Sequence, residues 1–454
     1  MNKLINTIKN IWNIEELRNK ILFTMACLAF FRLGSFIVLP GVIPSVLENS
    51  AKSNSNDLLG LVNVFTGGAF SNASVFALGI MPYITASIIV QLLGFAVPYF
   101  QRLQTKEGES GRKQLNQITR FLTVAITLVQ SGAYLTYVRS LGAVDQTLPA
   151  GVFWFSNIIV LTTGTILAMW LGEKINDRGI GNGVSVIIMI GILSRLPAAF
   201  VSELQLQIGN NGLILFVLEI ALLFFVIMFN VLIVQGVRRI PVQYAKRMVG
   251  RTADATLGMG SDRESIPIKV NAAGVMPIIF AQALMFIPAT AIQFLSGSKA
   301  APSAIMNALN DFTSIPYNVI YFILIVLFTY VYTALIINPT QYAEYLKRQN
   351  AFIPGIKPGE STAEYIDAVT TRITFPGSVF LAIIAILPAI VTAMGVNRGF
   401  ALFFGGTSLL IAVGVTLDTL QQVESHLLMR KYDGLIKSGR VKGRSNTMIE
   451  SNTK

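Results

Sequence analysis

The stretch LLGLVNVFTGGAFSNASVFALGIMPYITASIIVQLLGFAVPYFQ, residues 58–101, contains no Asp, Glu, Lys or Arg. A helix that crosses a bilayer needs about 20 mainly apolar residues, so this stretch is too long for a single span. Its first part, 58–74, is only weakly apolar because it contains Gly67, Gly68 and several small polar residues. We therefore predict a short, broken segment there that does not cross the bilayer, followed by a spanning helix at about 75–97. Irregular backbone at membrane depth is tolerated only inside protein or beside a water-filled cavity, so the broken segment indicates a pore.

The rest of the chain has the composition of an integral membrane protein. Hydrophobic residues make up 53% of the 454 residues, charged residues only 13%, and the mean hydropathy is +0.61. Soluble domains carry roughly 25% charged residues, so this composition excludes a soluble fold. Apolar runs predict an all-α integral membrane protein with ten transmembrane helices, at about 21–39, 75–97, 119–138, 152–172, 182–201, 213–236, 272–295, 317–339, 375–396 and 400–420.

Lys and Arg are distributed very unevenly over the segments between these runs. Of the 35 Lys and Arg residues, 29 fall in one set of alternating segments and 5 in the other, and Arg32 lies within a predicted span. Positive charge is retained on the cytoplasmic side, so both termini are predicted in the cytoplasm and the chain in the cell inner membrane. Residues 1–20 predict an amphipathic cytoplasmic helix, and residues 422–454 a cytoplasmic C-terminal tail.

Two of the predicted cytoplasmic loops, 237–271 and 341–374, are long and basic. Basic residues near helix ends set the topology of a membrane protein and attract anionic lipids. Loops of more than thirty residues with Gly-Pro punctuation, as at 354–359, are also typical of surfaces on which partners dock. Composition alone leaves both explanations open.

The chain offers no set of residues for catalysis or metal binding. Cys27 is its only cysteine and His426 its only histidine, so it can build neither an internal disulfide nor a zinc or haem site. We predict no enzyme activity and no cofactor. An ion-coupled small-molecule transporter usually has several charged residues within its spans, whereas here we find mainly Arg32 and Glu219. A conduit is favoured, and two interpretations of Glu219 remain open: a protonated acid, or a hydrogen bond to another helix.

Several strings of polar and small residues interrupt the apolar runs in a distinctive order. They are FRLGSF at 31–36, SVFALGIMPYITASIIVQLL at 74–93, KEGESGRKQ at 106–114, MWLGEKINDRGIGNGVSVII at 169–188, RRIPVQYAKR at 238–247, IPIKVNAAGVMPIIFA at 266–281, FIPGIKPGESTAEYID at 352–367 and FGGTSLLIAVGVTLDT at 404–419. Together these strings resemble the SecY/Sec61-alpha family, the channel subunits of the Sec protein translocon. The resemblance is collinear from about residue 15 to about residue 445.

The resemblance implies a fold and a set of site residues. It implies two five-helix halves, 21–202 and 213–421, which are related as an inverted repeat around an hourglass pore and joined by a hinge loop at 203–212. It places a plug at about 58–74, sealing the pore from outside. The residues that it assigns are Asn63, Phe65, Gly67 and Gly68 to the plug; Ile80, Ile84, Val184, Ile188, Ile279 and Ile411 to the pore ring; and Thr85, Gln91 and Asn271 to a lateral gate between 75–97 and 272–295.

The resemblance also implies a function and partners. The chain would move unfolded secretory proteins across the inner membrane and release transmembrane segments sideways into the lipid. Its partners would be the SecE and SecG subunits, the SecA motor, the ribosome, signal peptides and unfolded polypeptides, with SecDF and YidC as accessory partners. SecA and the ribosome would dock on Arg238, Arg239, Lys246, Arg247, Arg251, Lys347, Arg348 and Lys357.

Two positions depart from the family pattern. Lys357 stands where the family generally has arginine, and lysine does not reproduce the planar, forked donor set of a guanidinium. Val184 replaces a more usual isoleucine in the ring. We therefore expect a slightly wider ring at that position.

Overall fold

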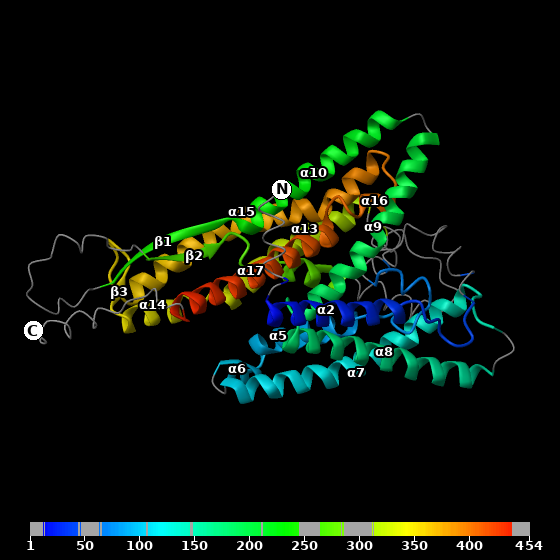
Figure 1. The fold of residues 1–454 in the computed structure, drawn as a ribbon, viewed down its shortest axis with the longest axis horizontal. Helices are drawn as coiled ribbons and strands as arrows, with labels where there is room; N and C mark the ends of the chain where they lie inside the picture. Colours follow the sequence, from blue (N-terminus) through cyan, green and yellow to red (C-terminus); the bar gives the residue numbers. More distant parts are fainter. Residues whose placement is uncertain are drawn as a thin grey trace, which may run out of the picture.

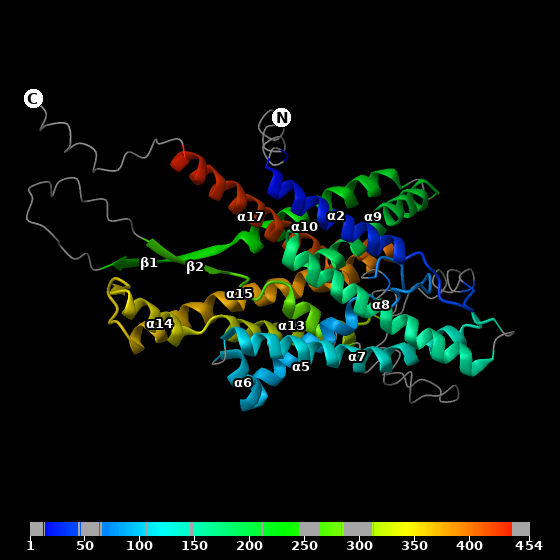
Figure 2. The same ribbon diagram turned by 60° about the horizontal axis from the view of Figure 1, so that its bottom comes forward.

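Long helices lie side by side through most of the computed structural model (Figures 1 and 2). The structure describes residues 12, 14–43, 46, 63, 66–105, 108–145, 149–209, 212–244, 264–282, 284–285, 311 and 313–437. Within these residues, seven helices are long and apolar enough to cross a membrane. With the shorter or less apolar ones included, the helices of the described part are α2 (Glu15–Gly34), α5 (Met81–Ala96), α6 (Pro98–Thr105), α7 (Gly108–Ser140), α8 (Ala150–Arg178), α9 (Gly183–Gly209), α10 (Leu213–Gln235), α13 (Ile315–Ile336), α14 (Pro339–Arg348), α15 (Glu360–Ala393), α16 (Arg398–Ala401) and α17 (Gly406–Lys437).

The helices differ in how much of their apolar surface the chain itself covers. In the most apolar stretch of α10, 17% of the residues are buried, whereas in the stretch that combines α16 and α17 the share is 78%. Ile214 and Phe224 on α10 are exposed over 89% and 70% of their surface. The first turns of α17 therefore lie in the interior of the molecule, and α10 presents apolar side chains outward, as a lipid-facing helix does.

Several predicted helix boundaries are wrong by a few residues. The first helix runs without a break from Glu15 to Gly34, so the predicted division at residues 20 and 21 does not exist, and residues 1–11 lie outside the described part. Chain beyond Gly34 instead pairs with the broken segment, where the Leu39 N–H donates to the Ala73 carbonyl. The helix predicted to begin at 375 begins at Glu360. The prediction missed its first turns because they carry charges, which lower the local hydropathy.

The helix predicted at 75–97 begins only at Met81. Residues 66–80 are turns, and Gly79 just before the helix has a positive φ of 55°. Pro82 lies in the first helical turn, where its fixed φ fits and its missing N–H would have had no partner. Of the helix predicted at 272–295, residues 276–282 and 284–285 are helical and the remainder lies outside the described residues.

The predicted hinge loop at 203–212 is mostly helical. Helix α9 continues to Gly209 and α10 begins at Leu213, which leaves a connection of three residues. Glu, Gln and Leu at 203–207 are good helix formers, and Glu203 and Gln207 are buried and hydrogen-bonded instead of solvated. Hydropathy cannot detect this continuation, because it counts these two residues as polar.

The described parts of the two long basic segments pair with each other in a small sheet. Strand β1 (Val237–Tyr244) pairs antiparallel with β2 (Glu264–Lys269) and with β3 (Ala351–Phe352), which gives the sheet order β2-β1-β3. The register sets Arg239 opposite Pro267 and Gln243 opposite Phe352. The description of both segments as loops was therefore incomplete, and the sheet lies with α14 at one end of the molecule, at the left of Figures 1 and 2.

Candidate pore, plug and gate

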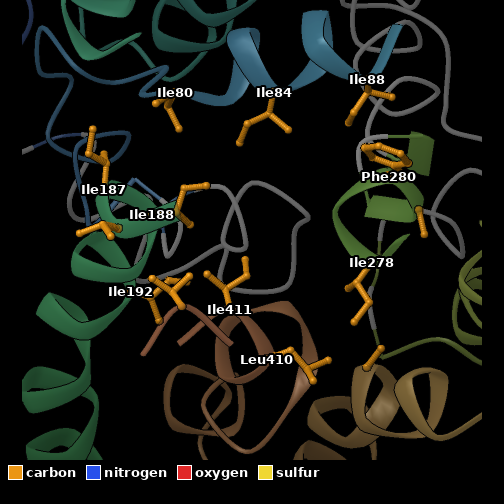
Figure 3. Packing of buried hydrophobic residues seen from close by; sticks show 14 of the residues in the cluster. Ile80, Ile84, Ile88, Ile187, Ile188, Ile192, Ile278, Phe280, Leu410 and Ile411 are labelled. Atoms are coloured by element: carbon orange, nitrogen blue, oxygen red, sulfur yellow. The ribbon is translucent and has the colours of Figure 1, made fainter. Parts of the chain in front are cut away.

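The six predicted ring residues belong to one apolar cluster. Four of them, Ile80, Ile84, Ile188 and Ile411, are buried members of it, and Val184 and Ile279 are partly buried side chains that pack against it. Figure 3 shows side chains of α5, α9 and α17 pointing toward one another across this cluster. Residues that are more than 200 positions apart along the chain therefore belong to one apolar cluster.

Close helix packing brings two of the ring residues together. A Cβ atom added to Gly172 on α8 would lie 3.3 Å from Cγ2 of Val184 and 3.5 Å from Cδ1 of Ile80. A Cβ atom added to Gly183 would collide with the Gly172 carbonyl. The two glycines let the start of α9 lie directly against α8. The ring positions on α9 are thereby held against the start of α5.

The cluster contains apolar residues that the sequence prediction missed. Ile192 lies four residues after Ile188 on α9, and Leu410 precedes Ile411 on α17. Ile278 is fully buried, whereas its neighbour Ile279 is partly buried. Extending the helical spacing by one turn from Ile188 would have found Ile192. Hydropathy contains no signal that separates Ile278 from Ile279.

The broken segment closes on itself around Asn63. The Asn63 side-chain oxygen accepts a hydrogen bond from the Ser71 N–H at 3.1 Å, and its backbone carbonyl accepts one from the Gly68 N–H at 2.8 Å. Gly67 and Gly68 have φ values of 64° and 92°, a conformation that L side chains rarely adopt. Phe65, the fourth predicted plug residue, lies outside the described residues.

Two arginines from different helices hold this segment. Arg32 on α2 donates from Nη1 to the Gly67 carbonyl at 2.7 Å, and its guanidinium lies 4.8 Å from the ring centre of Phe36. Arg195 on α9 donates from Nη2 to the Ser71 hydroxyl at 3.0 Å. A Cβ atom at Gly68 would overlap the Arg195 guanidinium, so only glycine fits there. The sequence prediction treated both arginines only as charges to be counted.

The predicted gate residues make their hydrogen bonds within α5 or are buried. Thr85 donates to the Met81 carbonyl at 3.1 Å, and Gln91 donates to the Ser87 hydroxyl at 3.2 Å. Asn271 is buried and follows the end of β2. Among the described residues, no hydrogen bond of Thr85 or Gln91 to the segment 276–285 is present. The boundary between α5 and the segment 276–285 therefore has polar side chains, but Thr85 and Gln91 make no hydrogen bond across it in the part of the chain that the structure describes.

The predicted docking residues that the structure describes are all exposed. Arg238 and Arg239 project from β1, whose Ile240 and Val242 are buried in a small apolar core under the sheet. The other described members are Lys347 and Arg348 at the end of α14 and Lys357 before α15, and Lys246, Arg247 and Arg251 lie outside the described residues. Because β1 pairs with β3, the two basic segments contribute strands to one sheet.

The family comparison decides which kind of protein this is. The family model described as SecY matches residues 74–420. The chain belongs to the SecY family. Its relatives include the protein translocase subunit SecY of Chlamydia muridarum, 41% identical over 96% of this chain and 99% of that protein, and that of Streptomyces scabiei, 42% identical over 96% and 100%.

Solved structures share the fold of this SecY-family chain. One described as a protein conducting channel covers 91% of this chain and 92% of its own, with a TM-score of 0.60 and 17% identity. Another, of an idle yeast Ssh1 complex bound to the yeast 80S ribosome, covers 89% of each chain with a TM-score of 0.60 and 14% identity. The predicted family and helical membrane fold are confirmed, as is a conduit rather than an enzyme.

Proposed function

We propose that this SecY-family chain is the protein-conducting channel of the Sec translocon, which moves unfolded secretory proteins outward and releases transmembrane segments sideways into the lipid. One observation carries the proposal: an apolar layer built from α5, α9, α17 and the segment 276–282 lies beside a broken segment that two arginines hold. The relatives' description as protein translocase subunits supports it.

The apolar layer suits a channel for unfolded chains. Such a channel must pass every kind of side chain, and a charged or strongly hydrogen-bonding ring would bind some of them. Isoleucine and valine side chains bind none strongly. When the pore is empty, an apolar constriction excludes water and blocks ions. We propose that Ile80, Ile84, Val184, Ile188, Ile279 and Ile411 form this ring, with the segment around Asn63, Gly67 and Gly68 as the plug.

We propose a lateral gate between α5 and the segment that begins at Asn271. A central Leu, Ile, Phe or Val favours the membrane by about 0.3–0.6 kcal/mol. A signal peptide has an apolar core of about 7–15 residues, so it gains several kcal/mol by leaving sideways. Thr85, Gln91 and Asn271 can form cross-gate hydrogen bonds of about 0.6–2 kcal/mol each. A signal peptide can outweigh a few such bonds, whereas a polar segment cannot and continues outward.

The remaining assignments extend this proposal to the whole complex. We infer ten spans in two halves, both termini in the cytoplasm and a position in the inner membrane, from the charge distribution and from family membership. The exposed basic surface on β1 and α14 suits SecA and the ribosome. Ribosome-bound structures among the fold neighbours support the ribosome as a partner. SecE, SecG, SecDF and YidC complete the proposed partners.

A transport assay tests the proposed function. The complete complex, purified with its own subunits, is reconstituted into liposomes with SecA, ATP and a labelled secretory precursor. We expect the precursor to become protected from added protease only when ATP and an intact signal sequence are present. A precursor that stays fully digestible in a folded complex would contradict the proposal. Ion flux that depends on a small-molecule substrate would instead favour a secondary transporter.

A further inference from the structure

A buried polar cluster lies where α9 passes into α10, away from the pore ring. Gln207 on α9 donates from Nε2 to Oε1 of Glu203 at 2.9 Å and to Oε1 of Glu219 on α10 at 3.2 Å. The backbone N–H of Asn397, in the turn before α16, donates to Oε2 of Glu203 at 3.0 Å. In Figure 1 the junction of α9 and α10 lies at the upper right, beside α16 and away from α5.

These side chains are buried to a degree that is unusual for their type. Glu203 is 1% exposed, Gln207 7% and Glu219 5%. Acidic side chains are almost never fully buried unless they are paired, because removing them from water is costly. The cluster resolves the open question about Glu219, which is hydrogen-bonded to another helix. Two carboxyl groups that converge on one amide nitrogen also repel each other unless one of them carries a proton.

The contacts of the cluster divide into two kinds by their place along the chain. The contact between Gln207 and Glu219 spans the three-residue connection of α9 and α10, so it lies close to any hinge there. The contact between Glu203 and Asn397 joins residues that are far apart in sequence: Glu203 lies on α9, whose earlier part belongs to the first proposed half, and Asn397 lies in the second half. If the halves rotate about the connection, the first contact hardly changes, whereas the second must lengthen.

We propose that Glu203 and the Asn397 N–H form a pin that holds the two halves in their closed arrangement, with Gln207 and Glu219 positioning the Glu203 carboxylate. This inference rests on the proposed function, because it takes α9 and α10 to be the hinge about which the lateral gate opens. The pin joins α9 to the turn before α16 and includes no residue of the gate. Weakening it shifts the balance toward the open gate without changing any residue of the pore.

The hydrogen bond to Asn397 can be removed with a matched control. Asn397 has a φ of −55°, which proline also adopts, so Asn397→Pro removes the N–H without straining this residue. The Asn397 side chain accepts a hydrogen bond from the Gly399 N–H, and both Asn397→Pro and Asn397→Ala lose that bond. Only Asn397→Pro also loses the bond to Glu203. Because the proline Cδ takes the place of the N–H hydrogen, the Glu203 carboxylate must also move away, so the difference between the two variants reports the loss of the whole Glu203–Asn397 contact.

The positioning residues have their own matched pair. Gln207→Leu removes the donor that aligns both carboxyl groups. Glu219→Gln keeps an oxygen that can accept from Gln207 while removing one ionisable group, so it should leave the pin intact.

Gate opening can be measured because the chain has one cysteine. With Cys27 replaced by alanine, spin labels are placed at position 89 on α5 and position 284, both exposed in the structure. The distance between the labels is measured in the complete complex in lipid nanodiscs, with and without a synthetic signal peptide. We expect Asn397→Pro and Gln207→Leu to raise the ratio of open to closed populations by about 3- to 10-fold, the effect of one lost hydrogen bond. Glu219→Gln should match the unmodified chain, and Asn397→Ala, which loses only the bond to Gly399, should have a smaller effect than Asn397→Pro.

The outcomes separate this inference from the proposed function. If the unmodified complex shows no change in distance with signal peptide, the proposed lateral gate is wrong and the pin has no gate to act on. If the unmodified gate responds but Asn397→Pro behaves as Asn397→Ala does, the pin is wrong and the channel proposal stands.

Thermal unfolding of each complex, monitored in parallel, shows whether a variant merely loosens the fold. Equal loss of stability in Asn397→Pro and Asn397→Ala with a difference in gate distance supports the pin.

Discussion

At the scale of single residues, the chain uses two kinds of side chain for two tasks. The proposed ring positions in the cluster where the helices converge are aliphatic, and such side chains fill space without selecting a partner. The broken segment beside it is held by Arg32 and Arg195, which bind strongly and directionally. On the proposed assignment, an apolar seal and a charged restraint lie next to each other. We expect their removal to have different consequences.

Polar replacement of the ring should open the seal. Changing Ile80, Ile188, Ile279 and Ile411 together to serine should raise the resting ion conductance, because a polar ring holds water and water carries ions. Leucine or valine at the same positions should leave conductance nearly unchanged. Planar-bilayer recordings of the purified complex measure the effect. A correctly folded serine variant with unchanged resting conductance would mean that other residues form the seal.

Removal of either arginine should release the broken segment. Hydrogen bonds to charged groups contribute about 1.5–3 kcal/mol each, so Arg32→Leu or Arg195→Leu should raise the resting leak by about 10-fold or more. Arg195→Lys should have an intermediate effect, because lysine keeps the charge but loses the fork. Arg139→Leu, at an exposed position on α7, serves as the control. A leak from the control equal to that from Arg195→Leu would contradict the restraint.

At the scale of elements, the sheet joins segments that the sequence keeps apart. Strand β1 buries Ile240 and Val242 against Leu346 of α14 and Ile366 of α15, and turns Arg238 and Arg239 outward. Two segments that hydropathy describes as independent loops thus contribute to one sheet with its own apolar core. We infer that this surface is rigid enough to orient a partner and not merely to attract it.

Charge reversal on β1 should weaken the docking of SecA without unfolding the sheet formed by β2, β1 and β3. Arg238→Glu with Arg239→Glu should reduce stimulation of the SecA ATPase, most strongly at low salt, because exposed charges are screened as ionic strength rises. The measurement is ATPase activity with reconstituted complex at two salt concentrations. Ile240→Ala, which removes buried volume under the same strand, should lower thermal stability instead. Normal stimulation by the folded double variant at both salt concentrations would show that docking lies elsewhere.

At the scale of the whole molecule, the distribution of Lys and Arg predicts which loops face the cytoplasm. The number of spans must agree with that sidedness. We expect tags at Ser50, Gly142 and Ala300 to face the periplasm. Tags at Ser110, Gly260 and Ser451 should face the cytoplasm, because 29 of the 35 Lys and Arg residues lie on that side of the predicted map. Labelling with a membrane-impermeant reagent, before and after lysis, tests every site. Labelling of Gly142 only after lysis would require a different number of spans.

The sequence by itself determined the helical membrane class, most of the spans and the family, and it marked the broken segment at 58–74. These features depend on local composition and on motifs in a fixed order, and both can be recognised from the sequence of residues along the chain. It also singled out six aliphatic positions that the structure brings into one cluster. That success rested on the resemblance, because isoleucines in a span look alike in a hydropathy profile.

Only the tertiary structure decided which buried polar groups, distant along the chain, form hydrogen bonds with one another. Hydropathy counts Glu203 and Gln207 as polar and ends the helix before them, whereas the fold buries both and pairs them with Glu219 and the Asn397 N–H. It likewise counts Arg32 as a cost within the membrane, whereas the fold gives it the Gly67 carbonyl. The physical reason is the same in each case. The free energy of a polar group in a membrane depends on its partner, and that partner lies many residues away along the chain.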